Sequence, residues 1–208
     1  MASAFPGRQE HVSNTAQTPT PLVIVGAGGH GRSVSELVQL AGTHTVAGFL
    51  DDQLPPGTEV LGVPVWGGTA ELPRLPERGV TAVHVAIGHN PTRAALLARV
   101  REAGLQAATL VHPRACVSPS ARLGTGCVVM ALAVIGTEAQ LGDGVIVNVG
   151  AVVDHHARVG DHGHLGANAT MAGGTSIGAR AWLQAGSALG YHTHLPDDTV
   201  VAPGEGRP

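Results

Sequence analysis

The chain has 208 residues and a mass of 21.0 kDa, a length that fits one large domain or two small ones. Hydrophobic residues make up 43% and charged residues 13%, so the chain can bury a core and is not disordered throughout. Its twelve basic residues, all arginine, are outnumbered by fifteen acids, and aromatic residues account for 2%. These figures exclude a generally basic surface for nucleic acid and an aromatic platform for single strands.

The first twenty residues, 1–20, are rich in Ser, Thr, Gln and Pro, and they predict a disordered arm. They contain no apolar stretch of the signal-peptide kind, and no run of eighteen apolar residues follows in the chain. Both features predict a cytoplasmic protein. The two cysteines, Cys116 and Cys127, are expected to be buried, reduced thiols.

Residues 21–31, PLVIVGAGGHG, predict a buried strand that runs into a glycine turn, with a helix over Ser33–Leu40. Gly26, Gly28 and Gly31 satisfy the pattern G-x-G-x-x-G. In that pattern the backbone N–H groups of the turn and the start of the helix face an anionic group such as a phosphate. The segment therefore predicts a phosphate-binding loop.

A second strand, Val46–Leu50, ends at Asp51 and Asp52, where a dinucleotide-binding fold places the acid that binds ribose. Alone, this pattern suggests NAD. Only three or four strands fit before the second half of the chain begins, however, so half of a dinucleotide fold is missing. A mononucleotide suits the available space better.

The strand Ala82–Ile87 is followed by Gly88, His89 and Asn90. Asn90 is expected to cap a helix that has proline at its first position and stops at Gly104. These elements complete a small α/β unit over residues 21–104.

From Leu105 to Val201, every sixth residue is aliphatic without a gap. A period of six is neither the 3.6 of a helix nor the alternation of a long strand, so each hexad predicts a short strand and a bend. Three hexads can close a triangular coil of eighteen residues, and about five stacked coils would fill a prism with aliphatic side chains. A charged residue at Ile135 or Val153 should then be incompatible with folding. Small residues recur four positions after the aliphatic one, at Ala115, Ala133, Ala151 and Ala169.

The repeat resembles that of the hexapeptide-repeat acyltransferases, and residues 21–201 together resemble the bacterial sugar acyltransferases that act on sialic acids or nucleotide-linked amino sugars. The motifs that carry the resemblance are VGAGGHGR, FLDD, AIGHNPTR and NVGAVVDHHARVGDHGHLGANATMAGG. It implies an α/β half-Rossmann-like domain over 21–104, a left-handed parallel β-helix over 105–201 and a short tail, 202–208. It further implies a homotrimer that uses acetyl-CoA, with no metal, no nucleic acid and no membrane insertion.

The resemblance also implies residue roles. His155 matches the general base of the family, a role that imidazole suits because its ordinary pKa lies near 6.5. The acetyl group would pass directly from acetyl-CoA to an amine or hydroxyl of the sugar, with no acyl-enzyme. The candidate catalytic residues are His155, Asp154 and His156. The candidates for contacting the coenzyme are His164, the backbone N–H of Gly173, Arg158 and Arg180. The candidates for binding the nucleotide sugar are Gly28, Gly29, His30, Asp51, Gly88, Asn90 and Asn148.

Two features depart from the family pattern. The family places Asp or Glu directly after the base to orient its imidazole, and this chain has His156 there. A second histidine stabilises no imidazolium when neutral, so Asp154 or Asp161 is expected to compensate. The chain also ends at VVAPGEGRP, without the longer tail that packs beside the coenzyme in many members.

Other functions stay open at this point. The chain could be a non-catalytic trimeric scaffold that binds nucleotide sugars, with His156 as the mark of lost catalysis. A zinc enzyme like the γ-class carbonic anhydrases would use histidines from two subunits, and the glycine turn leaves room for NAD-dependent redox chemistry. Nitrogen and oxygen acetylation need the same base, so the acceptor atom, the sugar and the nucleotide are undetermined.

Overall fold

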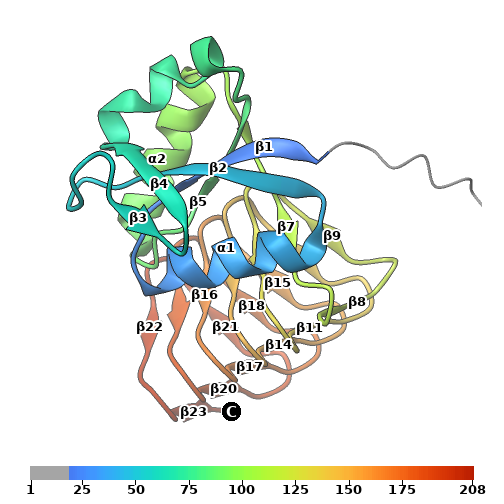
Figure 1. The fold of residues 1–208 in the computed structure, drawn as a ribbon. Helices are drawn as coiled ribbons and strands as arrows, with labels where there is room; N and C mark the ends of the chain where they lie inside the picture. The colour runs from blue at the N-terminus through green and yellow to red at the C-terminus, as the bar shows by residue number, and fades with distance from the viewer. Residues whose placement is uncertain (1–18) are drawn as a thin grey trace, which may run out of the picture.

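The structure is a computed structural model that describes residues 19–208. The predicted arm lies outside the described residues except for its last two positions, and Thr20 already begins the first strand. Two units follow one another along the chain, an α/β unit and a coiled stack of short strands (Figure 1). No helix of residues 19–208 is both long and apolar enough to cross a membrane.

The α/β unit is built on a six-stranded sheet with the order β3-β4-β2-β1-β5-β6, parallel except for the β3–β4 pair. Its strands are β1 (Thr20–Val25), β2 (His44–Leu50), β3 (Glu59–Val60), β4 (Val63–Gly67), β5 (Ala82–Val85) and β6 (Gln106–Ala107). The chain places β2 on one side of β1 and β5 on the other. This reversal creates a topological switch point at the carboxyl ends of β1 and β5, where parallel sheets bind ligands. The half-Rossmann-like prediction is confirmed.

Two helices cover the two faces of this sheet, α1 (Gly29–Ala41) and α2 (Asn90–Glu102), with short 3₁₀ turns at Thr69–Arg74 and Pro76–Arg78. Helix α1 begins four residues before the predicted start, because the glycine turn leads directly into it with Gly28 as N-cap. The cap of α2 is His89, so the prediction of Asn90 is wrong by one position. Asn90 is the first residue of the helix, and its side chain hydrogen-bonds to the β-helix instead of capping.

The second unit is the predicted left-handed parallel β-helix, in which each strand has two residues and pairs with the strand eighteen residues further on. The first face holds β7 (Leu110–Val111), β10 (Val128–Val129), β13 (Ile146–Val147), β16 (His164–Leu165), β19 (Trp182–Leu183) and β22 (Val200–Val201). The second holds β8 (Cys116–Val117), β11 (Val134–Ile135), β14 (Val152–Val153), β17 (Thr170–Met171), β20 (Ala188–Leu189) and β23 (Gly206–Arg207). The third holds β9 (Arg122–Leu123), β12 (Gln140–Leu141), β15 (Arg158–Val159), β18 (Ser176–Ile177) and β21 (His194–Leu195).

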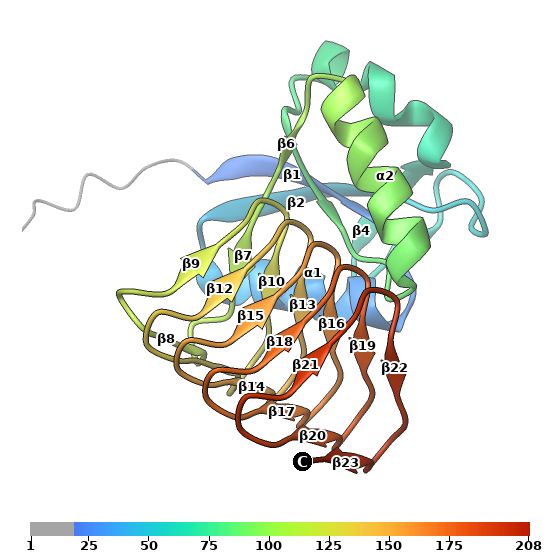
Figure 2. The ribbon, with the colours of Figure 1, turned by 180° about the vertical axis from the view of Figure 1, so that it is seen from behind.

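The aliphatic residue of each hexad points into the prism. Ile135 and Val153 are 1% and 0% exposed, as their positions in the repeat predict. Ala133 and Ala151, two of the recurring small residues, are also fully buried and belong to the same core cluster. Figure 2 shows the coils stacked one upon another along the helix.

The ends of the β-helix differ from the predicted limits. Leu105 keeps the period of six but packs into the core of the α/β unit, and the strand after it, β6, belongs to the α/β sheet. The first coil strand is therefore β7. At the other end, β23 pairs with β20, so the winding continues through the segment predicted as a tail.

The two units share a hydrophobic core. Helix α1 lies between the α/β sheet and the first face of the β-helix (Figure 1), and Val34 and Leu37 belong to the same buried cluster as Leu110, Val128 and Ile146. The junction therefore fixes the glycine turn relative to the coils.

The cysteine prediction is confirmed in one part only. Both cysteines are free, and Cys127 is buried. Cys116 is exposed, because it is the first residue of β8 and this position of each coil strand points outward from the prism. The aliphatic partner at the second position, Val117, packs against the core instead.

Candidate active site

The candidate catalytic histidine lies in a ladder of turns along the corner between the second and third faces of the β-helix, which we call the β14–β15 corner. Successive coils place the following pairs there, eighteen residues apart: Pro119–Ser120, Thr137–Glu138, His155–His156, Gly173–Gly174 and Tyr191–His192. The His156 N–H donates to the Thr137 carbonyl (2.9 Å), and the Gly174 N–H donates to the His155 carbonyl (3.0 Å). These bonds fix the backbone from which both imidazoles project.

His155 lies directly over Gly173 of the next coil. A Cβ atom at position 173 would overlap the imidazole of His155, so only glycine leaves space for the ring in this position. Within residues 19–208, the Gly173 N–H donates no hydrogen bond. The turn thus holds an unused backbone donor next to a half-exposed imidazole, and these two predicted site residues are brought together.

The His155 side chain is held by its neighbours in the same turn. Its backbone N–H donates to Asp154 Oδ1 (2.7 Å), while Asp154 Oδ2 is 3.9 Å from His155 Nε2, too far for a hydrogen bond. His155 Nδ1 lies 3.0 Å from His156 Nδ1. The three predicted catalytic residues therefore form one cluster, but Asp154 does not orient the imidazole.

Asp161, the other acid expected to compensate, lies at a different corner. Its Oδ1 accepts a hydrogen bond from the Asp143 N–H of the previous coil (2.9 Å). The carboxylate that does reach the cluster is Glu138, whose Oε2 is 3.1 Å from His156 Nε2. Sequence reasoning missed Glu138, although it precedes His156 by one coil of eighteen residues, and a search at that spacing finds it.

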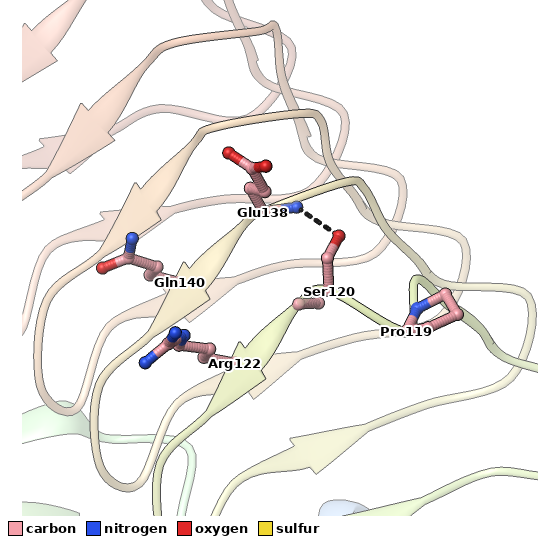
Figure 3. A pocket seen from close by; sticks show the side chains of 6 residues that line it. Pro119, Ser120, Arg122, Glu138 and Gln140 are labelled. Carbon is pink, nitrogen blue, oxygen red and sulfur yellow. Dashed lines mark hydrogen bonds between the residues drawn. The ribbon is translucent and has the colours of Figure 1, made fainter.

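An open pocket of about 470 Å³ lies on the same corner, one and two coils before His155 (Figure 3). Its lining residues are Pro119, Ser120, Ala121, Arg122, Glu138 and Gln140. The Glu138 N–H donates to Ser120 Oγ (3.0 Å), and the Glu138 carboxylate points away from Ser120. The pocket therefore shares Glu138 with the histidine cluster, through its contact with His156.

The glycine turn of the α/β unit has the local structure of a nucleotide-binding loop. Gly26 has a φ of 98° and packs against Ala86 and Ile87, and a Cβ on Gly31 would overlap the Gly26 carbonyl oxygen. By contrast, a Cβ placed on Gly28 or Gly29 would meet no described atom within 4 Å beyond the adjacent residues and the backbone of the helix itself. The first and last glycines thus shape the turn, while the middle ones leave the backbone open to a ligand.

A pocket of about 190 Å³ lies at the carboxyl ends of β1, β2 and β5, the switch point of the sheet. Asp51, a predicted contact for the nucleotide, is among the residues that line it. Its Oδ2 also accepts the Ala27 N–H (2.7 Å) and its Oδ1 accepts the Gln53 N–H (2.8 Å). Asp51 therefore also holds the glycine turn in place.

Four other predicted site residues lie at the junction of the two units. Asn90 Nδ2 donates to the Arg180 carbonyl (2.8 Å), and His164 Nδ1 is 3.2 Å from the Gly88 carbonyl oxygen. The His164 ring stacks on Trp182 with centroids 5.4 Å apart. Burial lowers the pKa of His164 to about 4, and burial together with His164 and Arg93 lowers that of His30 to about 4. Both imidazoles are therefore neutral at pH 7.

The remaining candidates make no hydrogen bond or ion pair with His155 within residues 19–208, although Arg158 begins the strand that follows the β14–β15 corner. Arg180 makes two hydrogen bonds of 2.7 Å to the Asp198 carboxylate. Arg158 is exposed on β15, and Asn148 lies in the turn after β13, where its Oδ1 accepts the Val149 N–H (2.8 Å). His164 lies on the first face and Asn148 at its edge, whereas His155 lies at the corner between the other two faces.

Sequence reasoning also missed Arg93, which is fully buried where α2 meets the β-helix. Its guanidinium donates to the Gly144 (2.8 Å), His162 (2.6 Å) and Ile87 (2.9 Å) carbonyls and to Asn90 Oδ1 (2.9 Å). Burial lowers its pKa to about 10, so it stays charged at pH 7. The sequence feature that could have revealed its burial is its spacing: Arg93 precedes Leu96 by three residues and so lies on the buried face of α2.

Across residues 19–208, no three His, Cys, Asp or Glu side chains converge in a way that could hold a metal ion. The polar clusters of the chain are hydrogen-bonded pairs and ladders instead. The β14–β15 corner holds two imidazoles, two carboxylates and the backbone donor of Gly173.

Comparison with known proteins gives the family of the chain. Residues 21–100 match the family described as the PglD N-terminal domain. A curated relative, UDP-N-acetylbacillosamine N-acetyltransferase of Bacillus subtilis, is 32% identical over 119 residues, which cover 53% of this chain. The match spans about half (51%) of that relative's length.

Two solved structures match over most of their length. PerB from Caulobacter crescentus, in complex with CoA and GDP-perosamine, is 41% identical, with 90% of this chain and 88% of that chain covered and a TM-score of 0.86. The acetyltransferase domain of PglB from Neisseria gonorrhoeae, in complex with acetyl coenzyme A, is 32% identical, with 91% and 99% covered and a TM-score of 0.73. Because the identity to PerB extends over both units, the chain belongs to the hexapeptide-repeat family of sugar N-acetyltransferases.

Proposed function

We propose that this chain transfers the acetyl group of acetyl-CoA to the amino group of a nucleoside-diphosphate-linked amino sugar. The amine nitrogen attacks the thioester carbonyl carbon while Nε2 of His155 takes the proton of the amine. The tetrahedral oxyanion accepts a hydrogen bond from the Gly173 N–H, and the C–S bond then breaks. The CoA sulfur leaves with the proton that His155 had taken, so the imidazole is neutral again for the next cycle.

The observation that carries this proposal is the stacking of His155 on Gly173. It brings a proton acceptor and an unused backbone donor to the same small space at a half-exposed turn. A positioned general base contributes roughly 10²-fold to 10⁴-fold, and one oxyanion donor about 3 kcal/mol. No nucleophilic side chain is needed, because the amine itself attacks the thioester.

The nucleotide of the acceptor occupies the pocket at the switch point of the α/β sheet. The open backbone at Gly28 and Gly29, at the start of α1, suits the diphosphate, and Asp51 and Asp52 line the pocket at the end of β2. A GDP-linked amino sugar is the first acceptor to test, since the solved relative with 41% identity holds GDP-perosamine.

The active enzyme is a homotrimer with its site between subunits. In one chain, His155 lies at one corner while Asn148 and His164 lie on or beside the first face, so a site that uses all three needs two copies. Leu132 (56% exposed) and Val149 (41% exposed) form an apolar strip beside Asn148 that a second copy would cover. Sedimentation should give three chains per particle, and a monomer at micromolar concentration contradicts this assembly.

We assign the enzyme to the cytoplasm. Its two free cysteines, one of them exposed, suit a reducing compartment.

The decisive experiment replaces His155 by alanine and measures thiol release and acetylated product with GDP-linked and UDP-linked amino sugars. We expect kcat to fall at least about 100-fold with unchanged thermal stability, because the base is lost and the turn is retained. His194→Ala, which removes an exposed histidine on β21, is the matched control and should keep the wild-type kcat. The proposal is wrong if His155→Ala keeps the wild-type kcat or if the wild-type protein acetylates neither sugar.

A further inference from the structure

In this chain His155 is followed by His156, where the family pattern has an acid. The structure contains another carboxylate, that of Glu138, which contacts His156 and through it His155. Glu138 Oε2 lies 3.1 Å from His156 Nε2, and His156 Nδ1 lies 3.0 Å from His155 Nδ1. The two rings are close to perpendicular (87°) with centroids 5.2 Å apart. Three side chains from two successive coils thus form one continuous line of contacts.

These contacts allow one arrangement of protons when both imidazoles are neutral. The Glu138 carboxylate only accepts hydrogen bonds, so His156 Nε2 must carry a proton and donate it. A neutral imidazole has one N–H, which leaves His156 Nδ1 as an acceptor. The proton between the two rings therefore belongs to His155 Nδ1, and Nε2 of His155 keeps its lone pair free.

We propose that Glu138 and His156 are positioning residues that act through one another on His155, holding it in the tautomer whose Nε2 accepts the proton of the sugar amine. The inference rests on the proposed function of His155. When the base takes its proton, the positive charge on His155 can be shared with His156, and the Glu138 carboxylate stabilises the charged pair. Glu138 thereby replaces, one coil away, the acid that is missing after the base.

Among the side chains around His155, Glu138 supplies the carboxylate that comes closest to the imidazole pair. Asp154 Oδ1 accepts the hydrogen bond of the His155 backbone N–H, and Asp154 Oδ2 lies 3.9 Å from His155 Nε2. The next coil presents Gly173 and Gly174, which carry no titratable group, and His192 of the coil beyond lies over Gly174. The previous coil presents the neutral Thr137 beside Glu138.

The backbone at His156 has a conformation that recurs in the turns of this corner. Its φ is 59°, and Glu138 (57°) and His192 (60°) have the same left-handed conformation at the equivalent positions of other coils. Glu138 and His156 therefore project from the same backbone position in successive coils, which lets their side chains meet.

The test is a double-mutant cycle of Glu138→Gln and His156→Asp. Asp at position 156 places a carboxylate oxygen at the same number of bonds from the backbone as His Nδ1, so it can accept directly from His155 Nδ1. We expect Glu138→Gln alone to lower kcat roughly 10-fold to 100-fold with little change in either KM. His156→Ala should lower kcat to a similar extent, and His156→Asp should recover most of that loss, because its carboxylate replaces the acceptor for His155 Nδ1. In the His156→Asp background, Glu138→Gln should have no effect.

The pH profile supplies a readout that a merely structural role would not move. Removing the Glu138 charge makes protonation of the pair less favourable, so the acidic limb of the kcat profile should move to lower pH in Glu138→Gln. The proposal is overturned if Glu138→Gln keeps the wild-type kcat and profile, or loses the same factor in both backgrounds. If His155→Ala is inactive in that case, His155 is still supported as the base, and only the positioning role of Glu138 and His156 is contradicted. If His155→Ala is active, the proposed function itself fails.

Discussion

At the scale of single residues, position 173 determines whether the proposed base, His155, and the proposed oxyanion donor, the Gly173 N–H, can face the same substrate. The His155 ring occupies the space where any side chain at 173 would begin. The hydrogen bonds of the turn hold the backbone of both coils, so the ring and not the backbone would have to move. Glycine at position 173 is therefore needed to make room for the His155 ring, and the β-helix backbone itself does not require it.

We expect Gly173→Ala to lower kcat about 100-fold, because the new methyl group displaces the imidazole from the Gly173 N–H. Stability should change little. Gly206→Ala is the matched control, since a Cβ at position 206 of β23 meets no described atom within 4 Å. The measurement is kcat together with the thermal midpoint of both variants. Wild-type turnover in Gly173→Ala contradicts the assigned geometry.

Part of this residue-scale geometry could be read from the sequence. His155 and Gly173 are eighteen residues apart, so the repeat alone places them at the same corner in successive coils. The line from Glu138 to His155 could not be predicted in full, because it depends on side-chain rotamers at two turns as well as on spacing. Spacing also could not show how Asp154 and Asp161 are used: Asp161 accepts a backbone N–H at another corner, while Asp154 accepts the His155 N–H with one oxygen and keeps the other 3.9 Å from His155 Nε2.

At the scale of the elements, each coil strand has one inward and one outward residue. Ile135 fills the prism between neighbouring coils, while Val134 beside it points outward and is only partly covered. Because each coil contacts only its neighbours, the loss of one inward side chain leaves a cavity that the stacked coils cannot close easily.

Ile135→Ala should therefore lower the free energy of unfolding by about 2–5 kcal/mol. Val134→Ala removes a similar side chain one residue away and should cost about 1 kcal/mol or less. Urea unfolding of both variants measures the difference. Equal losses would mean that the prism is not the main source of stability.

The period of six predicted the strands and their pairing because burial of one residue in six is the physical cause of the repeat. It could not locate the first coil, since Leu105 is buried for a different reason. Gly104 (φ 69°) ends helix α2, and the turn after it bonds the Leu105 N–H to the Val100 carbonyl, so Leu105 packs against the helix that it leaves. Pattern alone does not distinguish these two kinds of burial.

At the scale of the whole molecule, the two units are joined by buried polar groups as well as by apolar contact. Arg93 crosses the junction and satisfies carbonyl groups of both units, among them those of Ile87 and Gly144. The sequence does not predict this arrangement, because the carbonyls belong to the backbone and carry no sequence signal. The same junction buries His30, His84 and His164, each with an Nε2 that has no partner within residues 19–208.

These histidines should make the protein sensitive to acid. Burial lowers the pKa of His30, His84 and His164 to about 4, from an ordinary value of 6.5. Between pH 6.5 and about 4 the unfolded chain therefore binds more protons than the folded chain, so the free energy of unfolding falls as the pH falls. The loss is about 2 kcal/mol for each histidine by pH 5. Carboxylates with lowered pKa values, such as Asp198, contribute only below this window.

His84→Asn isolates one member of this group. His84 Nδ1 lies 2.9 Å from the Ala108 carbonyl oxygen, and an Asn side chain can place its amide N–H in the same position without taking up a proton. We expect the urea midpoint to fall less between pH 7 and pH 5 in this variant than in wild type, while above pH 7 the midpoints of the two proteins change with pH to a similar extent. If the variant loses stability with falling pH as steeply as wild type, the acid sensitivity does not come from the buried imidazoles of the junction.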